Sequence, residues 1–188
     1  MEWNGIRIKT VILVFVVSLA VLLGCHWVYA NYGYNQPLKQ VLNDNPVVKS
    51  FTINDEGQTV YVTVRLNRVD NLMVTYRDLN QKVSESLGDR PYQLVIEDDR
   101  DGSLEQVYYR SHYAIHEAIM KGNFSEMVSV IERQASAVDA DADVYVDSDN
   151  VYVQMDNGKH FLYAVVPRTA KALEGPQAGG GGIYVQGN

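Results

Sequence analysis

The longest hydrophobic stretch of the chain lies near its start. Residues 11–30 carry no charged side chain, and a helix of that length would extend for about 30 Å, the thickness of a bilayer's hydrocarbon core. Arg7 and Lys9 precede the stretch, and no basic side chain follows directly after it. The positive-inside rule then predicts a single-pass membrane protein with residues 1–10 in the cytoplasm and residues 31–188 outside it.

Two features of this segment predict other ways of processing it. Leu22-Leu23-Gly24-Cys25 resembles a bacterial lipobox, in which Cys25 would be lipidated. Val28-Tyr29-Ala30 is a small-residue cleavage site, after which an export signal could be removed. An uncleaved anchor, a lipoprotein and a cleaved signal therefore stay open as alternatives. A buried helix of a soluble protein would leave the basic flank and the aromatic end unexplained.

After a polar spacer at 31–36, residues 37–98 alternate between helical and strand periodicity. The clearest strand covers 59–66, where buried-type Val and Leu side chains alternate with polar ones. The apolar residues of 71–87 recur at helical spacing. The pattern predicts a helix-strand-strand-helix-strand unit with elements at about 37–44, 47–53, 59–66, 71–87 and 91–97.

The following residues, 103–167, predict a second unit with the order helix-helix-strand-strand-strand. Its expected elements lie at about 104–121, 124–138, 143–147, 151–156 and 160–166. Asp156-Asn157-Gly158 is a hairpin signal between the last two strands. Residues 168–188 are rich in glycine, and we expect a flexible tail. The whole pattern predicts an α+β protein with a transmembrane helix and two units, each with helices on one face of a mostly antiparallel sheet, or one composite domain.

The composition excludes several classes of function. The 188 residues carry a net charge of −7, which argues against a nucleic-acid partner. Cys25 is the only cysteine, so the region after residue 30 has no thiol for a disulfide, a nucleophile or a thiolate metal site.

The acidic turn after the strand at 91–97 partly matches a calcium loop. With Glu97 at position one, Asp99, Asp101 and Gly102 occupy positions three, five and six. Position twelve, which should be a bidentate Glu, is Tyr108. Carboxylates also favour the positive end of a helix dipole without any metal. We therefore prefer a solvated acidic helix start over a calcium site with Asp99 and Asp101 as ligands.

Two histidines form the other candidate metal site. His112 and His116 are four residues apart on a predicted helix and face the same side, as zinc ligands can. Glu105 or Glu117 could add a third ligand. The metalloprotease motif needs Glu directly after the first His, whereas this chain has Tyr113. We prefer ordinary surface or packing roles for both histidines, and we predict no cofactor.

The element order of 37–98 resembles two small exported modules, the ring-building motif of secretion and sporulation channel proteins and the BON domain of envelope proteins. The resemblance rests on that order, on the segments 47–53 and 59–64, and on Gly57 in the strand turn. It covers about a third of the chain and carries no functional residue.

No catalytic motif stands out in the sequence. We find no nucleophile elbow, no phosphate-binding glycine loop and no dinucleotide fingerprint. The sequence therefore predicts a non-enzymatic binding or assembly module of a bacterial cell envelope, held at the membrane by residues 11–30 and acting through a protein partner or by self-association. The alternatives are an enzyme using carboxylates on cell-wall material, and a calcium- or ligand-sensing ectodomain.

Overall fold

The protein has an α+β fold, as predicted. The computed structural model describes residues 2–3, 6–32, 35–55 and 59–168. Within these residues there are five helices and two sheets of three strands, together with a short hairpin of β1 (Glu2–Trp3) and β2 (Ile6–Arg7). The predicted Gly-rich tail beyond residue 168 and the turn glycine Gly57 lie outside the described residues, as do residues 33 and 34 of the predicted spacer.

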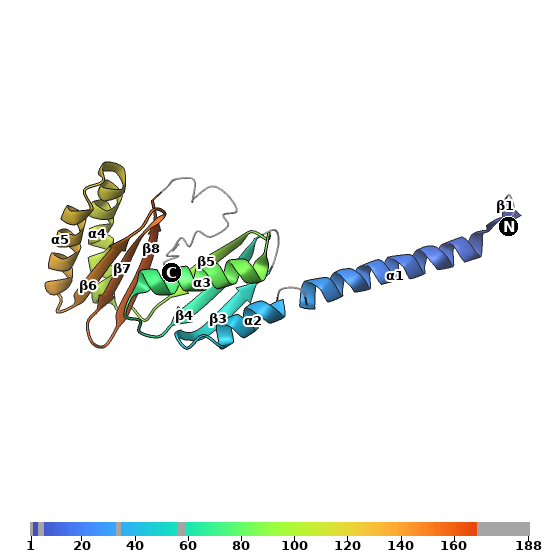
Figure 1. Ribbon diagram of the computed structural model, residues 1–188, viewed down its shortest axis with the longest axis horizontal. Helices are drawn as coiled ribbons and strands as arrows, with labels where there is room; N and C mark the ends of the chain where they lie inside the picture. The colour runs from blue at the N-terminus through green and yellow to red at the C-terminus, as the bar shows by residue number, and fades with distance from the viewer. Residues whose placement is uncertain (1, 4–5, 33–34, 56–58, 169–188) are drawn as a thin grey trace.

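Helix α1 (Ile8–Tyr32) projects away from the rest of the molecule (Figure 1). Its side chains are described over residues 10–25, and the large hydrophobic ones among them are exposed. Among the residues that the structure describes, none of the helices combines the length and the apolar character needed to cross a bilayer. The predictions of a transmembrane segment at 11–30 and of a single-pass membrane location are therefore wrong.

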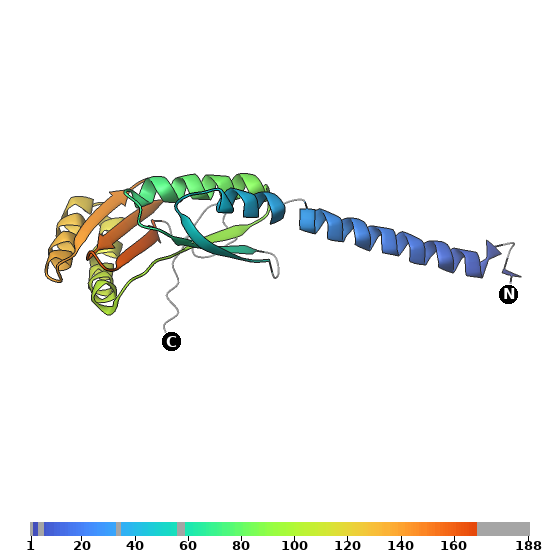
Figure 2. The same ribbon diagram turned by 90° about the horizontal axis from the view of Figure 1, so that it is seen from below.

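The first sheet combines one antiparallel and one parallel pairing. Its strands β3 (Val48–Asn54), β4 (Val60–Leu66) and β5 (Tyr92–Glu97) lie in that order, with β3 antiparallel and β5 parallel to β4. The parallel pair requires a crossover connection, which α3 (Leu72–Leu87) provides. Helices α3 and α2 (Asn35–Asn43) cover one face of this sheet, as Figure 2 shows. The opposite face carries exposed side chains such as Tyr61.

The second sheet is an antiparallel meander that follows two helices. Helices α4 (Gly102–Lys121) and α5 (Phe124–Ser136) precede β6 (Asp141–Val146), β7 (Asn150–Asp156) and β8 (Phe161–Pro167). The strands are paired in sequence order, and both hairpins are antiparallel. The ends of the described elements from α2 onwards lie within two residues of the predicted ones, because hydrophobic periodicity and turn residues define them locally.

The second sheet is buried on both faces, which differs from the expectation of helices on one face only. On one face, Val153 and Leu162 belong to a cluster with α4 and α5. On the other, Tyr152 and Tyr163 belong to the cluster that α3 forms with the first sheet. Strands β7 and β8 therefore lie between two helical layers, and the two units share one hydrophobic cluster (Figure 1).

Polar side chains of the second sheet hold the start of α3. The Tyr163 hydroxyl accepts a hydrogen bond from the Val69 backbone N–H at 2.9 Å. The Gln154 amide accepts from the Leu72 N–H at 3.0 Å and donates to the Val69 carbonyl at 2.9 Å. Asn71 is the N-cap of α3 and accepts from the Val74 N–H. The start of α3 is therefore satisfied partly by residues more than eighty positions later in the chain.

Candidate functional site

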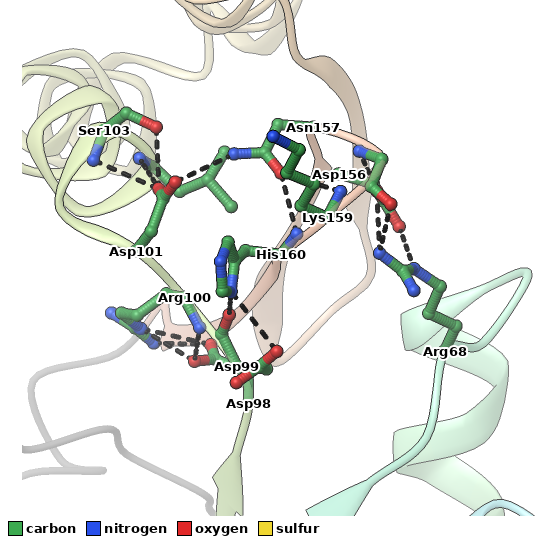
Figure 3. A network of polar contacts seen from close by, with 12 residues as sticks. Arg68, Asp98, Asp99, Arg100, Asp101, Ser103, Asp156, Asn157, Lys159 and His160 are labelled. Atoms are coloured by element: carbon green, nitrogen blue, oxygen red, sulfur yellow. Dashed lines mark hydrogen bonds and ion pairs between the residues drawn. The ribbon is translucent and has the colours of Figure 1, made fainter.

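The acidic turn after β5 lies in a polar network that joins the two units (Figure 3). Asp101 is the N-cap of α4, and its Oδ1 accepts from the backbone N–H groups of Ser103 and Leu104 at 3.1 and 2.9 Å. Its Oδ2 accepts from the Asn157 side chain at 3.0 Å. The sequence Ser103-Leu104-Glu105-Gln106 has the pattern of a capping box, in which Ser103 would be the N-cap. In the structure the N-cap is Asp101, two residues earlier.

These hydrogen bonds set the protonation state of Asp101. The Leu104 N–H and the Ser103 side chain hold the pKa of the Asp101 carboxyl down at about 2, with further contributions from Asn157 and His160. Both carboxylate oxygens already have donors in the folded chain. A calcium ion at Oδ1 would compete with the donors that cap α4.

Asp98 is the most enclosed carboxylate of the turn. Its side chain is 4% exposed and pairs with Arg100, which is 16% exposed, at 2.7 Å between Oδ2 and Nη2. The same Oδ2 accepts from the Tyr163 backbone N–H at 2.7 Å, at the edge of the second sheet. Asp98 therefore satisfies an edge-strand donor of β8 and neutralises a mostly buried arginine, which is a structural role.

Asp99, the other predicted calcium ligand, points to a different neighbour. Its Oδ2 lies 3.3 Å from His160 Nδ1, and its carbonyl lies 3.0 Å from the same nitrogen. Glu97 pairs with Arg65 at 3.3 Å. Figure 3 shows Asp99 and Asp101 directed toward different parts of the hairpin. The structure thus gives each of these carboxylates a protein partner of its own.

Arg68 adds a second link between the units. It donates from Nε to Asp156 Oδ2 at 2.6 Å and from Nη2 to the Gly158 carbonyl at 3.0 Å (Figure 3). Burial raises the pKa of the Asp156 carboxyl, but Arg68 and the Gly158 N–H outweigh burial, so the pKa is lowered overall. Asp156 is therefore held in its ionised form by the loop that precedes α3.

The histidine pair lies on the solvent-exposed side of α4. The rings of His112 and His116 have centroids 4.2 Å apart and are inclined by 59°. Partial burial and the neighbouring His116 lower the pKa of His112. Glu117, a predicted third ligand, instead pairs with Lys121 at 2.5 Å. No group of three or more His, Cys, Asp or Glu residues suited to a metal ion occurs in the described part of the chain.

The thiol predicted as a lipidation site lies on α1. Cys25 is free and exposed. Because Cys25 lies on α1, it belongs neither to the polar network nor to the helices α4 and α5 of the second unit. Lipidation of Cys25 stays a prediction.

A polar cleft of about 440 Å³ lies between α3 and the turn that joins β6 to β7. Its walls include Arg77 and Asn80 of α3, and its floor includes the buried rings of Tyr92 and Tyr152. Asp147 at its rim accepts from the Tyr152 hydroxyl at 2.9 Å. The cleft was not predicted from the sequence, because it combines residues from segments about seventy positions apart.

The groups in this cleft have protonation states that suit a structural role. Burial raises the pKa of the Asp147 carboxyl. The hydrogen bonds from the N–H groups of Asn150 and Asp149 and from the Tyr152 hydroxyl outweigh burial, so the pKa is lowered overall. Burial raises the pKa of Tyr152. A general acid at neutral pH needs a carboxyl with a raised pKa, and a tyrosine base needs a lowered one. The pKa of Asp147 is lowered and that of Tyr152 is raised, so each shift is opposite to the one that such catalysis needs.

The exposed face of α4 carries large hydrophobic side chains that face solvent. Tyr109, Tyr113 and Met120 are 70%, 74% and 85% exposed. Their spacing of four and seven residues places them on one side of the helix, and His116 lies beside them. We call the four residues Tyr109, Tyr113, His116 and Met120 the α4 stripe. This surface was not predicted, although residues 109, 113 and 120 recur at helical spacing on the side opposite Leu104 and Ile115.

Helix α4 presents this stripe on a rigid element. The Asp101 cap fixes its first turn, and Gly122 closes its end with a left-handed backbone at φ 79°. Leu104, Val107, Ile115 and Ala118 bury the opposite face against the second sheet and α5. The stripe therefore keeps a defined spacing in solution.

Comparisons of the chain with protein-family models, with curated proteins and with solved structures found no match. These comparisons therefore add no support to the resemblance of residues 37–98 to ring-building and BON modules, and no residue role comes with it.

Proposed function

We propose that this chain is a non-enzymatic binding module that contacts a protein partner through the α4 stripe. The observation that carries the proposal is the exposure of two tyrosines and a methionine side by side on one rigid helix face. Scattered exposed apolar residues are common on monomers, but a contiguous aromatic patch is typical of interaction sites. Tyrosine and methionine are also enriched in the cores of protein interfaces.

The chemistry of the remaining polar groups supports a binding role over catalysis. The carboxylates of the acidic turn are committed to a helix cap, an edge strand and ion pairs. In the cleft beside α3, Asp147 and Tyr152 have pKa shifts opposite to those useful for acid or base catalysis. The carboxylate enzyme and the calcium or ligand sensor stay alternative predictions.

Site-specific photo-cross-linking tests this proposal. A photoreactive residue would replace Tyr113 in the full chain, in cells that produce it, and replace the exposed Tyr61 of the first sheet in a matched control. We expect protein adducts from position 113 that are absent or much weaker at position 61. Equal adducts at the two positions, or none at position 113, would contradict the proposal.

A further inference from the structure

We infer that the partner of the α4 stripe is a second copy of this chain, with the two α4 helices packed antiparallel and Tyr113 next to the two-fold axis. This inference rests on the proposed function, since it names the partner for the same surface. A two-fold interface must be self-complementary, because the same patch serves on both sides. The residues around Tyr113 meet that requirement.

The first sign of self-complementarity is the charge on one flank of the stripe. Arg110 and Glu117 are seven residues apart, about two helical turns, and therefore lie on the same side of α4. They are placed almost symmetrically about Tyr113. In an antiparallel pair centred there, Arg110 of each copy faces Glu117 of the other, which gives two ion pairs of opposite charge.

The present partners of these residues leave room for such a pairing. Glu117 accepts from Lys121 through Oε1, and Oε2 has no donor among the described residues. Arg110 is exposed and has no hydrogen-bond or ion-pair partner in the described part of the chain. An unpaired arginine beside exposed tyrosines, in a chain with a net charge of −7, suits a carboxylate from another molecule.

The second sign is the match of the other flank and of the centre. Tyr109 and His116 are also seven residues apart, so each would meet the other across the interface. Aromatic rings in such contact favour edge-to-face or offset packing. Tyr113 would meet its own symmetry mate, and Met120 would cover the stem of Gln106. Each large side chain of the stripe thus finds a counterpart in the second copy.

In the antiparallel arrangement, the flank that carries Arg110 and Glu117 meets the same flank of the second copy, whereas in a parallel two-fold pair it would meet the opposite flank. The two Arg110–Glu117 contacts therefore belong to the antiparallel arrangement. A single helix pair is a small interface, so we expect a dimer with a Kd in about the micromolar range.

Charge reversal with equilibrium sedimentation of the full chain tests the inference. Arg110→Glu and Glu117→Arg should each raise the dimer Kd by about tenfold, because each replaces two attractive contacts with two repulsive ones. The double variant should restore the Kd to near that of the original chain, because opposite charges face each other again.

Matched controls lie on α5. Glu132→Arg and Arg133→Glu make the same charge changes at exposed positions outside the stripe and should leave the Kd unchanged. A chain that stays monomeric, an association unaffected by the α4 substitutions, or a double variant as weak as the singles would overturn the inference. If position 113 cross-links to a different protein while the chain is monomeric, the proposed function stands and the second copy is excluded. If position 113 cross-links to no protein, the proposed function and the inference of a second copy both fail.

Discussion

At the scale of single residues, the acidic turn shows how polar groups become committed within the fold. Asp98, Asp99 and Asp101 are close in sequence, yet they bind Arg100, His160 and Asn157 respectively. Spacing along the chain gave a partial calcium-loop match through Glu97, Asp99 and Asp101, although a solvated acidic helix start was the preferred interpretation. His160 and Asn157 come from the hairpin between β7 and β8, which spacing within the turn does not reveal.

The depressed pKa of Asp101 makes a prediction about acid stability. Its pKa is about 2 in the folded chain and near 3.8 when unperturbed, so the unfolded chain takes up this proton first as the pH falls. The stabilisation is therefore complete above pH about 4 and is lost as the pH falls toward about 2. Asp101→Asn keeps a good cap but removes this proton linkage.

Denaturant unfolding at several pH values checks this prediction. We expect the free energy of unfolding of Asp101→Asn to be lower than that of the original chain at neutral pH, because the ionised carboxylate is lost, and to fall less steeply between pH about 5 and pH about 2, so that the two profiles converge in acid. Two parallel pH profiles would show that Asp101 has no such linkage.

At the scale of elements, the start of α3 depends on the second sheet. The Tyr163 hydroxyl and the Gln154 amide satisfy backbone groups at Val69 and Leu72. These bonds lie beside the cluster that Tyr152, Tyr163 and α3 share. The two units are therefore joined by buried hydrogen bonds as well as by apolar contact. We expect substitutions in β8 that remove these bonds to lower the free energy of unfolding.

Tyr163→Phe tests this dependence. The substitution keeps the ring but leaves the buried Val69 N–H without its acceptor, which should lower the free energy of unfolding by about 2 kcal/mol. Tyr61→Phe, at an exposed position outside the α4 stripe, should change it by less than about 0.5 kcal/mol. Urea unfolding monitored by fluorescence measures both. Equal effects of the two substitutions would contradict the role of this hydroxyl.

The sequence predicted the elements well but not their shared core. The alternation of Val60, Val62 and Val64 reports one buried face directly, since the period of a strand is local. The run Phe161-Leu162-Tyr163-Ala164-Val165-Val166 was predicted as a strand covered by helices on one face, whereas the structure buries it on both faces. Which layer covers the second face depends on the packing of α3, whose contacts are distant in sequence.

At the scale of the whole molecule, two hydrophobic surfaces lie far apart. Helix α1 extends from one end, while α4 and α5 form the other (Figure 1). The apolar residues of 11–30 suggested a membrane span, whereas no helix in the described residues meets the length and hydrophobicity that spanning needs. The α4 stripe was not predicted, because His112 and His116 were considered only as candidate metal ligands or as ordinary surface residues.

The central claim is the antiparallel pairing of α4 about Tyr113, and a cysteine scan of the α4 stripe tests it most directly. Single cysteines would replace Tyr109, Tyr113, His116 and Met120 in the full chain carrying Cys25→Ser, followed by mild oxidation and non-reducing electrophoresis. A two-fold axis at Tyr113 brings only that position within disulfide reach of its own copy. The account predicts a disulfide-linked dimer for Tyr113→Cys and little for the other three. Dimers of similar yield at every position, as parallel helices would give, or no dimer at position 113, would contradict it.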